Sequence, residues 1–176
     1  MKNIIFARYW NICLLRESPE NTPFSYIRML LSAFVLILLM IFEWRSTQFN
    51  SSNDVMMATG LVCSYFIYTY AVLQIKGLTS RWVQTTTSLY CMNIIIHILV
   101  VPLLLLSPFL SQIHLKNPFF LFLGVLYLFL SIGVTVWQFV ITAHIYKYAL
   151  NTTAIQSVLV AFGLIAVNIL TVSLLQ

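Results

Sequence analysis

Residues 82–106 read WVQTTTSLYCMNIIIHILVVPLLLL, a run without a single Asp, Glu, Lys or Arg. As a helix this run is about 37 Å long, which exceeds the ~30 Å hydrocarbon core of a bilayer. It does not alternate polar and apolar residues as a membrane β-strand does. Because backbone polar groups in lipid must be satisfied within the segment, the run predicts a transmembrane α-helix.

The rest of the chain has the same character. Hydrophobic residues make up 61% of the sequence and charged residues 7%, whereas a soluble domain carries about a quarter charged residues. The five apolar runs are residues 24–42, 54–75, 82–106, 118–146 and 153–175. The gaps between them are too short to bury a separate core. The predicted fold class is therefore an all-α membrane protein, with residues 24–176 forming five transmembrane helices in one bundle.

Residues 1–23 precede the first run and have a different composition. Apolar and aromatic residues are interspersed here with Lys2, Arg8 and Arg16, which predicts an interfacial amphipathic helix on the cytoplasmic membrane surface. The apolar face is broad, so docking on the bundle or on a partner is the alternative. The segment from Ser18 to Pro23 contains two prolines and ends this helix.

The positive charges predict the orientation of the chain. If all five runs cross the membrane, seven of the nine basic residues fall on one side: Lys2, Arg8, Arg16, Arg28, Lys76, Arg81 and Lys147. Only Arg45 and Lys116 fall on the other. Positive loops remain in the cytoplasm, so we predict a cytoplasmic N-terminus and an outside C-terminus. The net charge of +5 is then a topology signal, and no nucleic-acid partner is predicted.

Polar residues inside membrane helices are the best indication of a functional site. We define a candidate polar seam by two helix faces. Its members are Thr86, Tyr90, Asn93 and His97 in the third run and Ser131, Thr135 and Gln138 in the fourth. The seam either lines a path for a solute or proton, with His97 as the titrating group, or joins helices by hydrogen bonds.

The acidic residues favour the second alternative. Proton relays and ion-coupled transporters usually contain a buried carboxylate, and no Asp or Glu lies in the middle of a predicted span. We interpret Glu43, with Trp44 and Arg45, as an interfacial anchor at the outer membrane boundary rather than a functional charge pair. The polar stretch of residues 81–88 is either a cytoplasmic docking surface or a capped helix start.

No reactive motif is recognisable. The cysteines and histidines are scattered through the sequence, at Cys13, Cys63, Cys91, His97, His114 and His144. No zinc-ligand spacing, nucleophile elbow or nucleotide-binding loop is present. We therefore expect no enzymatic activity, no metal and no cofactor.

Three short motifs carry a resemblance to a known family. They are Leu14-Leu15-Arg16-x-Ser18-Pro19, Arg81-x-x-Gln84-Thr85, and Trp137 with His144-Ile145. Together with five spans, they resemble small bacterial inner-membrane proteins with a Yip1-like layout. Eukaryotic Yip1 proteins are linked to Rab GTPases and vesicle traffic and carry an acidic-Tyr-Gly-Pro motif, which this chain lacks. The resemblance thus implies a non-catalytic five-helix bundle in a bacterial inner membrane, without a specific function.

These observations favour a non-catalytic integral membrane protein that acts as a scaffold, an assembly factor or a subunit of an envelope complex. The alternative is a small transporter or channel subunit that uses the polar seam around Asn93 and His97. The expected partners are the lipid bilayer and other membrane proteins or further copies of the chain.

Overall fold

The computed structural model describes residues 2–46, 53–111 and 118–175, and every regular element in these ranges is helical. The elements are α1 (Lys2–Cys13), η1 (Pro19–Asn21), α2 (Tyr26–Ser46), α3 (Asp54–Ile75), η2 (Thr79–Arg81), α4 (Trp82–Ser111), α5 (Pro118–Ala149) and α6 (Ala154–Leu175). Helices α2 to α6 are each long and apolar enough to cross a membrane, which confirms the five predicted spans.

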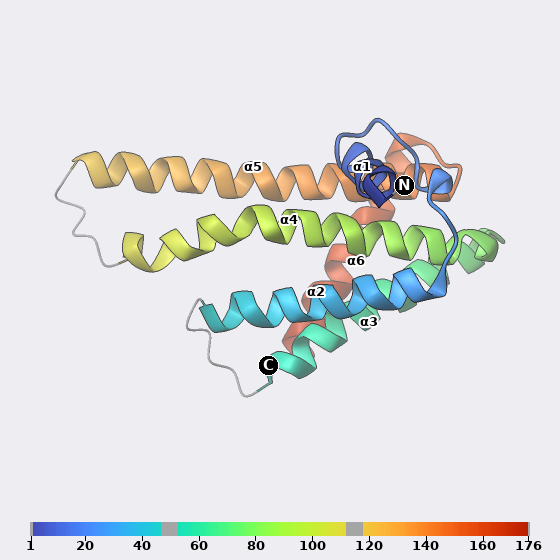
Figure 1. Cartoon of the computed structure of the whole chain (residues 1–176), viewed down its shortest axis with the longest axis horizontal. Coiled ribbons are helices and arrows are strands. Elements are labelled where there is room, and N and C mark those ends of the chain that lie inside the picture. Colours follow the sequence, from blue (N-terminus) through green and yellow to red (C-terminus); the bar gives the residue numbers. More distant parts are fainter. Residues whose placement is uncertain (1, 47–52, 112–117, 176) are drawn as a thin grey trace.

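Consecutive long helices run antiparallel (Figure 1). The starts of α2, α4 and α6 lie at the same end of the molecule as the ends of α3 and α5, and α1 lies there too; we call this the α1 end and the opposite one the far end. At the far end, Asn53 Nδ2 donates a 3.3 Å hydrogen bond to the carbonyl of Leu175. This bond joins the start of α3 to the end of α6.

Helix α4 lies at the centre of the packing, in contact with α1, α2, α3 and α5. Its fully buried apolar side chains include Leu89, Tyr90 and Met92. Helix α5, in contrast, exposes many large apolar side chains, among them Leu128, Phe129 and Ile132. In water this surface would be strongly unfavourable, whereas acyl chains cover it without cost.

Residues in the left-handed backbone conformation follow α3 and α5, the helices that end at the α1 end. Gly77 has φ 70° and follows α3, and the N–H of Leu78 donates to the carbonyl of Leu73 over 2.9 Å. Asn151 has φ 49° after α5, where the N–H of Thr152 donates to the carbonyl of Lys147 over 3.1 Å. Glycine and asparagine are the residues that adopt this conformation most readily, so both turns are encoded locally.

The second half of α1 lies against the long helices. Tyr9, Ile12 and Cys13 are buried, and Trp137 Nε1 donates a 3.1 Å hydrogen bond from α5 to the carbonyl of Cys13. Contact with α4 and α5 therefore accounts for the burial of these three side chains. The location of α1 on the membrane surface remains a prediction.

Candidate intramembrane site

A carboxylate and an imidazole meet between α2 and α4. The Nδ1 atom of His97 lies 2.7 Å from Oε2 of Glu43. A carboxylate oxygen accepts, so His97 donates through Nδ1. The Glu43 side chain is 7% exposed and that of His97 21% exposed. The pair is therefore a largely enclosed polar contact inside two helices of membrane-spanning length.

Glu43 is more than the exposed end of an apolar run, because its carboxylate is buried against His97. Helix α2 does not end at Phe42 but continues to Ser46, so Glu43 belongs to its last helical turns. Helices α2 and α4 both start at the α1 end and run parallel, so the last turns of the shorter α2 lie beside the middle of α4, which continues past His97 to Ser111. The Glu43 carboxylate is consequently buried within the protein, and its position relative to the membrane boundary stays a prediction.

Burial of this pair costs free energy unless each group satisfies the hydrogen bond or the charge of the other. A carboxylate removed from water pays a desolvation cost of several kcal/mol, and the attraction of a neighbouring cation offsets it only in good geometry.

The pair lines a cavity of about 360 Å³ between α2, α4 and α5. The other lining residues are Trp44, Ile96, Val100, Leu103, Leu104, Tyr127, Ser131, Val134, Thr135 and Gln138. Among these residues Glu43 is the one acidic side chain and His97 the one basic side chain. The cavity thus combines apolar walls, two aromatic rings and a small set of polar groups, as small-molecule sites do.

A second polar contact lies one helical turn from His97. Gln138 Nε2 donates a 2.8 Å hydrogen bond to Asn93 Oδ1, and the Tyr65 hydroxyl lies 3.4 Å from the same oxygen. Gln138 and Thr135 also line a second cavity of about 250 Å³, toward α3 and α6. These two residues of α5 therefore stand between the two cavities.

The structure brings most of the predicted polar seam together. His97, Ser131, Thr135 and Gln138 line the first cavity, and Asn93 is hydrogen-bonded to Gln138. The hydroxyls of Ser131 and Thr135 each donate over 2.9 Å to a carbonyl of their own helix. Their contribution to the cavity is therefore a hydroxyl oxygen whose proton is already engaged.

Two predicted seam residues lie elsewhere. The Tyr90 hydroxyl donates a 2.8 Å hydrogen bond to the carbonyl of Val62 and so joins α4 to α3. Thr86 is fully buried, and its hydroxyl has no hydrogen-bond partner among the described residues. The neighbouring side chains of residues 85–88 are all buried as well. These four residues belong to the interior, so the prediction that they form a cytoplasmic docking surface is wrong.

The sequence prediction missed Glu43 and Trp44 as residues of this cavity. A signal for Glu43 was present in the spacing of α2. The buried residues of this helix are Met29, Ser32, Leu36, Met40 and Glu43, separated by three, four, four and three positions. This is the repeat of a single helix face, and Glu43 continues it.

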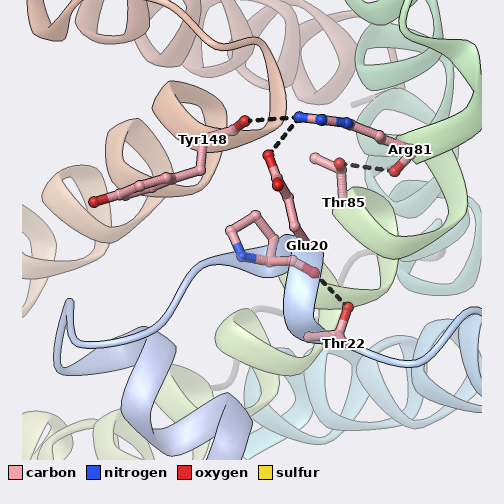
Figure 2. A network of polar contacts seen from close by, with 6 residues as sticks. Glu20, Thr22, Arg81, Thr85 and Tyr148 are labelled. Carbon is pink, nitrogen blue, oxygen red and sulfur yellow. Dashed lines mark hydrogen bonds and ion pairs between the residues drawn. The ribbon is translucent and has the colours of Figure 1, made fainter.

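A separate polar network holds the N-terminal segment at the α1 end (Figure 2). The Arg81 guanidinium pairs with the Glu20 carboxylate and lies 3.4 Å from the Tyr148 carbonyl. Gln84 donates over 2.8 Å to the carbonyl of Thr22. The ion pair is about one third exposed, so solvent screens it and it contributes less than about 1 kcal/mol. This network attaches the segment between α1 and α2, which we call the N-terminal strap, to α4 and α5.

Within the described ranges, no group of three or more His, Cys, Asp or Glu side chains could hold a metal ion. His114 lies outside those ranges. The three cysteines are free thiols.

The fold and the site define a multi-pass integral membrane protein with a titratable pair between its helices. No protein-family model matches the chain, and no curated protein or solved structure shows significant similarity to it. The Yip1-like resemblance therefore stays a prediction, and a function has to be inferred from the geometry of the site.

Proposed function

We propose that this chain is a small transport protein, or the transport subunit of a larger complex, that binds a solute beside Glu43 and His97. The observation that supports this proposal is the carboxylate buried against a histidine in the wall of a cavity. Ionisable residues inside membrane helices are rare because they are costly, and they mark ion or substrate sites. The sequence favoured a scaffold because it lacked a buried carboxylate, and Glu43 removes that reason.

The pair also offers a way to couple solute binding to protons. Histidine is the side chain whose ordinary charge change falls between pH 5 and pH 8. A solute that changes the charge balance at Glu43 would change the proton occupancy of His97, since the two atoms are 2.7 Å apart. Binding on one side of the membrane and release on the other would then move protons as well.

A non-enzymatic role agrees with the hydrogen bonds of the cavity. The Ser131 and Thr135 hydroxyls donate to carbonyls of their own helix rather than to a base. His97 directs Nδ1 to Glu43. We therefore assign the polar groups to binding and propose no catalytic step and no cofactor.

The orientation that we propose has the α1 end in the cytoplasm of a bacterial cell and the C-terminus outside the inner membrane. The order of the helices brings Lys76, just after α3, and Lys147, in the last turn of α5, to the α1 end, next to the N-terminal segment with its own basic residues. Arg45 lies toward the far end, and Lys116 is outside the described residues. This asymmetry supports the orientation through the positive-inside rule.

A scaffold or assembly role is the second candidate, and the surface of α5 favours it. Large apolar side chains cover the exposed face of this helix, and Gly124 and Gly133 both border open space, where a β-carbon would meet no other described atom. Lipid or another membrane helix can cover such a face. A discrete larger complex on native gels, lost on changing Phe129 to Ser, would support this role.

Cysteine accessibility tests whether the cavity is a hydrated binding site. Ser131→Cys, in a chain whose native cysteines are replaced, should react with a water-soluble maleimide, because Ser131 lines the cavity. Ile132→Cys is the matched control: it is the next residue of α5 and is exposed on the outer surface, which we expect lipid to cover. Equal lack of reaction at both positions would exclude a hydrated cavity and leave the scaffold role as the better proposal.

A further inference from the structure

We propose that the second cavity, between α3, α5 and α6, binds a small uncharged carboxamide, that is, a primary amide group on an apolar body. The inference goes beyond the proposed function, because it concerns a separate site and takes no support from Glu43 or His97. Three features of the described residues support it: a lining without charge, unused hydrogen-bonding groups on two amide side chains, and access from the outer surface.

The wall of the second cavity is uncharged. The described residues that line it include no Asp, Glu, Lys, Arg or His. Most of its polar members carry a hydroxyl or an amide: Tyr65, Thr135, Gln138, Thr142 and Asn168. The rest of the lining is Phe139 with leucine and isoleucine side chains. A charged ligand would lose its hydration here without gaining a counter-charge, at a large cost in free energy. The wall therefore selects an uncharged ligand with an apolar body.

Asn168 of α6 supplies a hydrogen-bond donor. Its Oδ1 atom lies 2.6 Å from Ser64 Oγ, and its other polar contact among the described residues is the Tyr65 hydroxyl. That hydroxyl donates its own proton to Asn93, so it can accept one of the two N–H groups on Asn168 Nδ2. At least one N–H of Asn168 thus has no partner in the described part of the chain. Nδ2 is not a fully enclosed atom, so a ligand can reach it.

Gln138 of α5 supplies an acceptor. Its Nε2 atom donates to Asn93, whereas Oε1 has no hydrogen bond with any described residue and is not fully enclosed. Gln138 and Asn168 line the same cavity from two different helices. A primary carboxamide carries a carbonyl acceptor and N–H donors on neighbouring atoms, so it can bond to both side chains at once. An alcohol offers both functions through one oxygen, which suits two separate helices less well.

The cavity borders the outer surface of the protein. Ile165 and Ile169 line it and are also exposed, by 39% and 60%. In a membrane protein this surface is expected to face acyl chains, so a ligand would enter from the lipid. A small uncharged amide with an apolar body can dissolve in lipid, whereas an ion cannot. The route of entry therefore favours the same class of ligand as the wall does.

The size of the cavity suggests a suitable probe. Its volume is about 250 Å³, which exceeds the roughly 150 Å³ of an apolar cavity that binds benzene. Benzamide is a benzene ring with one primary amide group and fits this space. The ring would contact Phe139 and the aliphatic side chains. The amide would then bond to Asn168 through its carbonyl and to Gln138 through its N–H.

The first measurement is the binding of radiolabelled benzamide to the purified wild-type protein in detergent. An excess of unlabelled benzamide separates saturable binding from partition into micelles. Three molecules of similar shape then compete with it. Acetophenone has a methyl group in place of the amide nitrogen and should bind about three- to tenfold more weakly. Benzoate, an anion, and toluene, which lacks both polar groups, should bind at least tenfold more weakly.

Two variants separate the acceptor from the donor. Gln138→Leu removes the partner of the ligand N–H, so the preference for benzamide over acetophenone should disappear. Asn168→Leu removes the partner of the carbonyl, which both molecules have, so both affinities should fall about three- to tenfold. Gln156→Leu is the matched control for the first variant. It changes an exposed glutamine of α6 that does not line the cavity, and it should keep the wild-type preference.

Each outcome supports or overturns the inference. Loss of the preference in Gln138→Leu but not in Gln156→Leu supports it. Equal binding of benzamide and acetophenone by the wild type would overturn the amide class, and equal binding of toluene would indicate a site for acyl chains. Absence of saturable binding would overturn the site. The wild-type measurements decide these points even if a variant fails to fold.

Labelling of Ser131→Cys keeps this inference distinct from the proposed function, because Ser131 lines only the first of the two cavities. Benzamide should leave the rate of maleimide labelling at this position unchanged. A slower rate with benzamide would place the ligand in the first cavity and overturn the assignment to the second. The labelling without benzamide tests the proposed function alone.

Discussion

Gln138 on α5 and Asn93 on α4 are joined by a 2.8 Å hydrogen bond at the wall between the two intramembrane cavities. Asn93 is fully buried, and its own amide donates over 2.8 Å to the carbonyl of Leu89. Its side-chain oxygen therefore has to be satisfied by other helices. Gln138 meets this need directly, and Tyr65 does so over a longer distance.

Replacing Gln138 by Leu should lower the free energy of unfolding by about 1 kcal/mol, which is within the range for hydrogen bonds between membrane helices. The change leaves Asn93 with Tyr65 as its remaining partner from another helix. Unfolding titrations in mixed detergent measure the effect. Thr135→Val is the control, because that hydroxyl bonds within its own helix, and a loss as large as that of Gln138→Leu would contradict the assignment.

Gly163→Ala should destabilise the contact between α3 and α6. A β-carbon at position 163 would overlap the Tyr68 hydroxyl, which donates a 2.8 Å hydrogen bond to the carbonyl of Val160. We expect a cost of about 1–3 kcal/mol in unfolding titrations. Gly133→Ala is the control, since open space surrounds that position, and it should be neutral or stabilising.

The double variant Gly163→Ala with Tyr68→Phe tests the cause of that loss. Removing the hydroxyl removes the overlapping atom, so the double variant should be more stable than Gly163→Ala alone. Additive losses from the two changes would contradict a steric origin.

Cys13 should resist alkylation in the folded protein. Burial raises the pKa of this thiol to about 11, so at pH 8 only about one thiol in a thousand is the reactive thiolate. The thiolate fraction should rise about tenfold for each pH unit toward that value. Iodoacetamide labelling followed by mass spectrometry measures the rate for each cysteine, and sodium dodecyl sulfate should release the protection.

Trp137→Phe should make Cys13 react faster. The indole donates to the Cys13 carbonyl, so its loss weakens the attachment of α1 to α5 and promotes local opening. Trp10→Phe lies on an exposed face of α1 and serves as the control. Equal labelling rates in both variants and the wild type would show that this hydrogen bond does not hold α1 in place.

Arg81→Gln should loosen the N-terminal strap without unfolding the helices. It removes the ion pair with Glu20 and the contact with the Tyr148 carbonyl (Figure 2). Trypsin cleavage after exposed Arg16 should become several times faster, in keeping with a contribution below about 1 kcal/mol. High salt should screen the ion pair and bring the cleavage rate of the wild type closer to that of the variant. Lys76→Gln, exposed in the neighbouring turn, should cleave at the wild-type rate.

The orientation predicts opposite labelling of the two ends in whole cells. In a chain without native cysteines, Arg45→Cys should react with a membrane-impermeant maleimide, whereas Lys76→Cys should react only after permeabilisation. Both positions are exposed. Residue 45 precedes α3 and residue 76 follows it, so the two positions lie at opposite ends of that helix. The reversed pattern would show that the α1 end faces outward.

The five spans were predictable because span formation depends on a local quantity. A run such as residues 154–175 is apolar over the thickness of a bilayer, and a backbone in lipid has to form a helix there whatever its neighbours are. The turns at Gly77 and Asn151 are similarly local, since they need a residue that tolerates positive φ.

The site was predictable only in part. The face that contains Asn93 and His97 follows from helical periodicity, and so does a face of α5 that contains Ser131, Thr135 and Gln138. Which of these residues meet depends on how far one helix is shifted along another. That shift results from packing of many side chains and leaves no short-range pattern in the sequence.

The sequence by itself determined that this chain is a helical membrane protein, because the length and polarity of each run suffice for that conclusion. Only the tertiary structure decided what Glu43 does. The residue lies close to the end of an apolar run, where a membrane-boundary position is the ordinary expectation. The alignment of α2 against the longer α4 places its carboxylate beside His97, which is 54 residues away in the chain, and makes it half of a buried titratable pair.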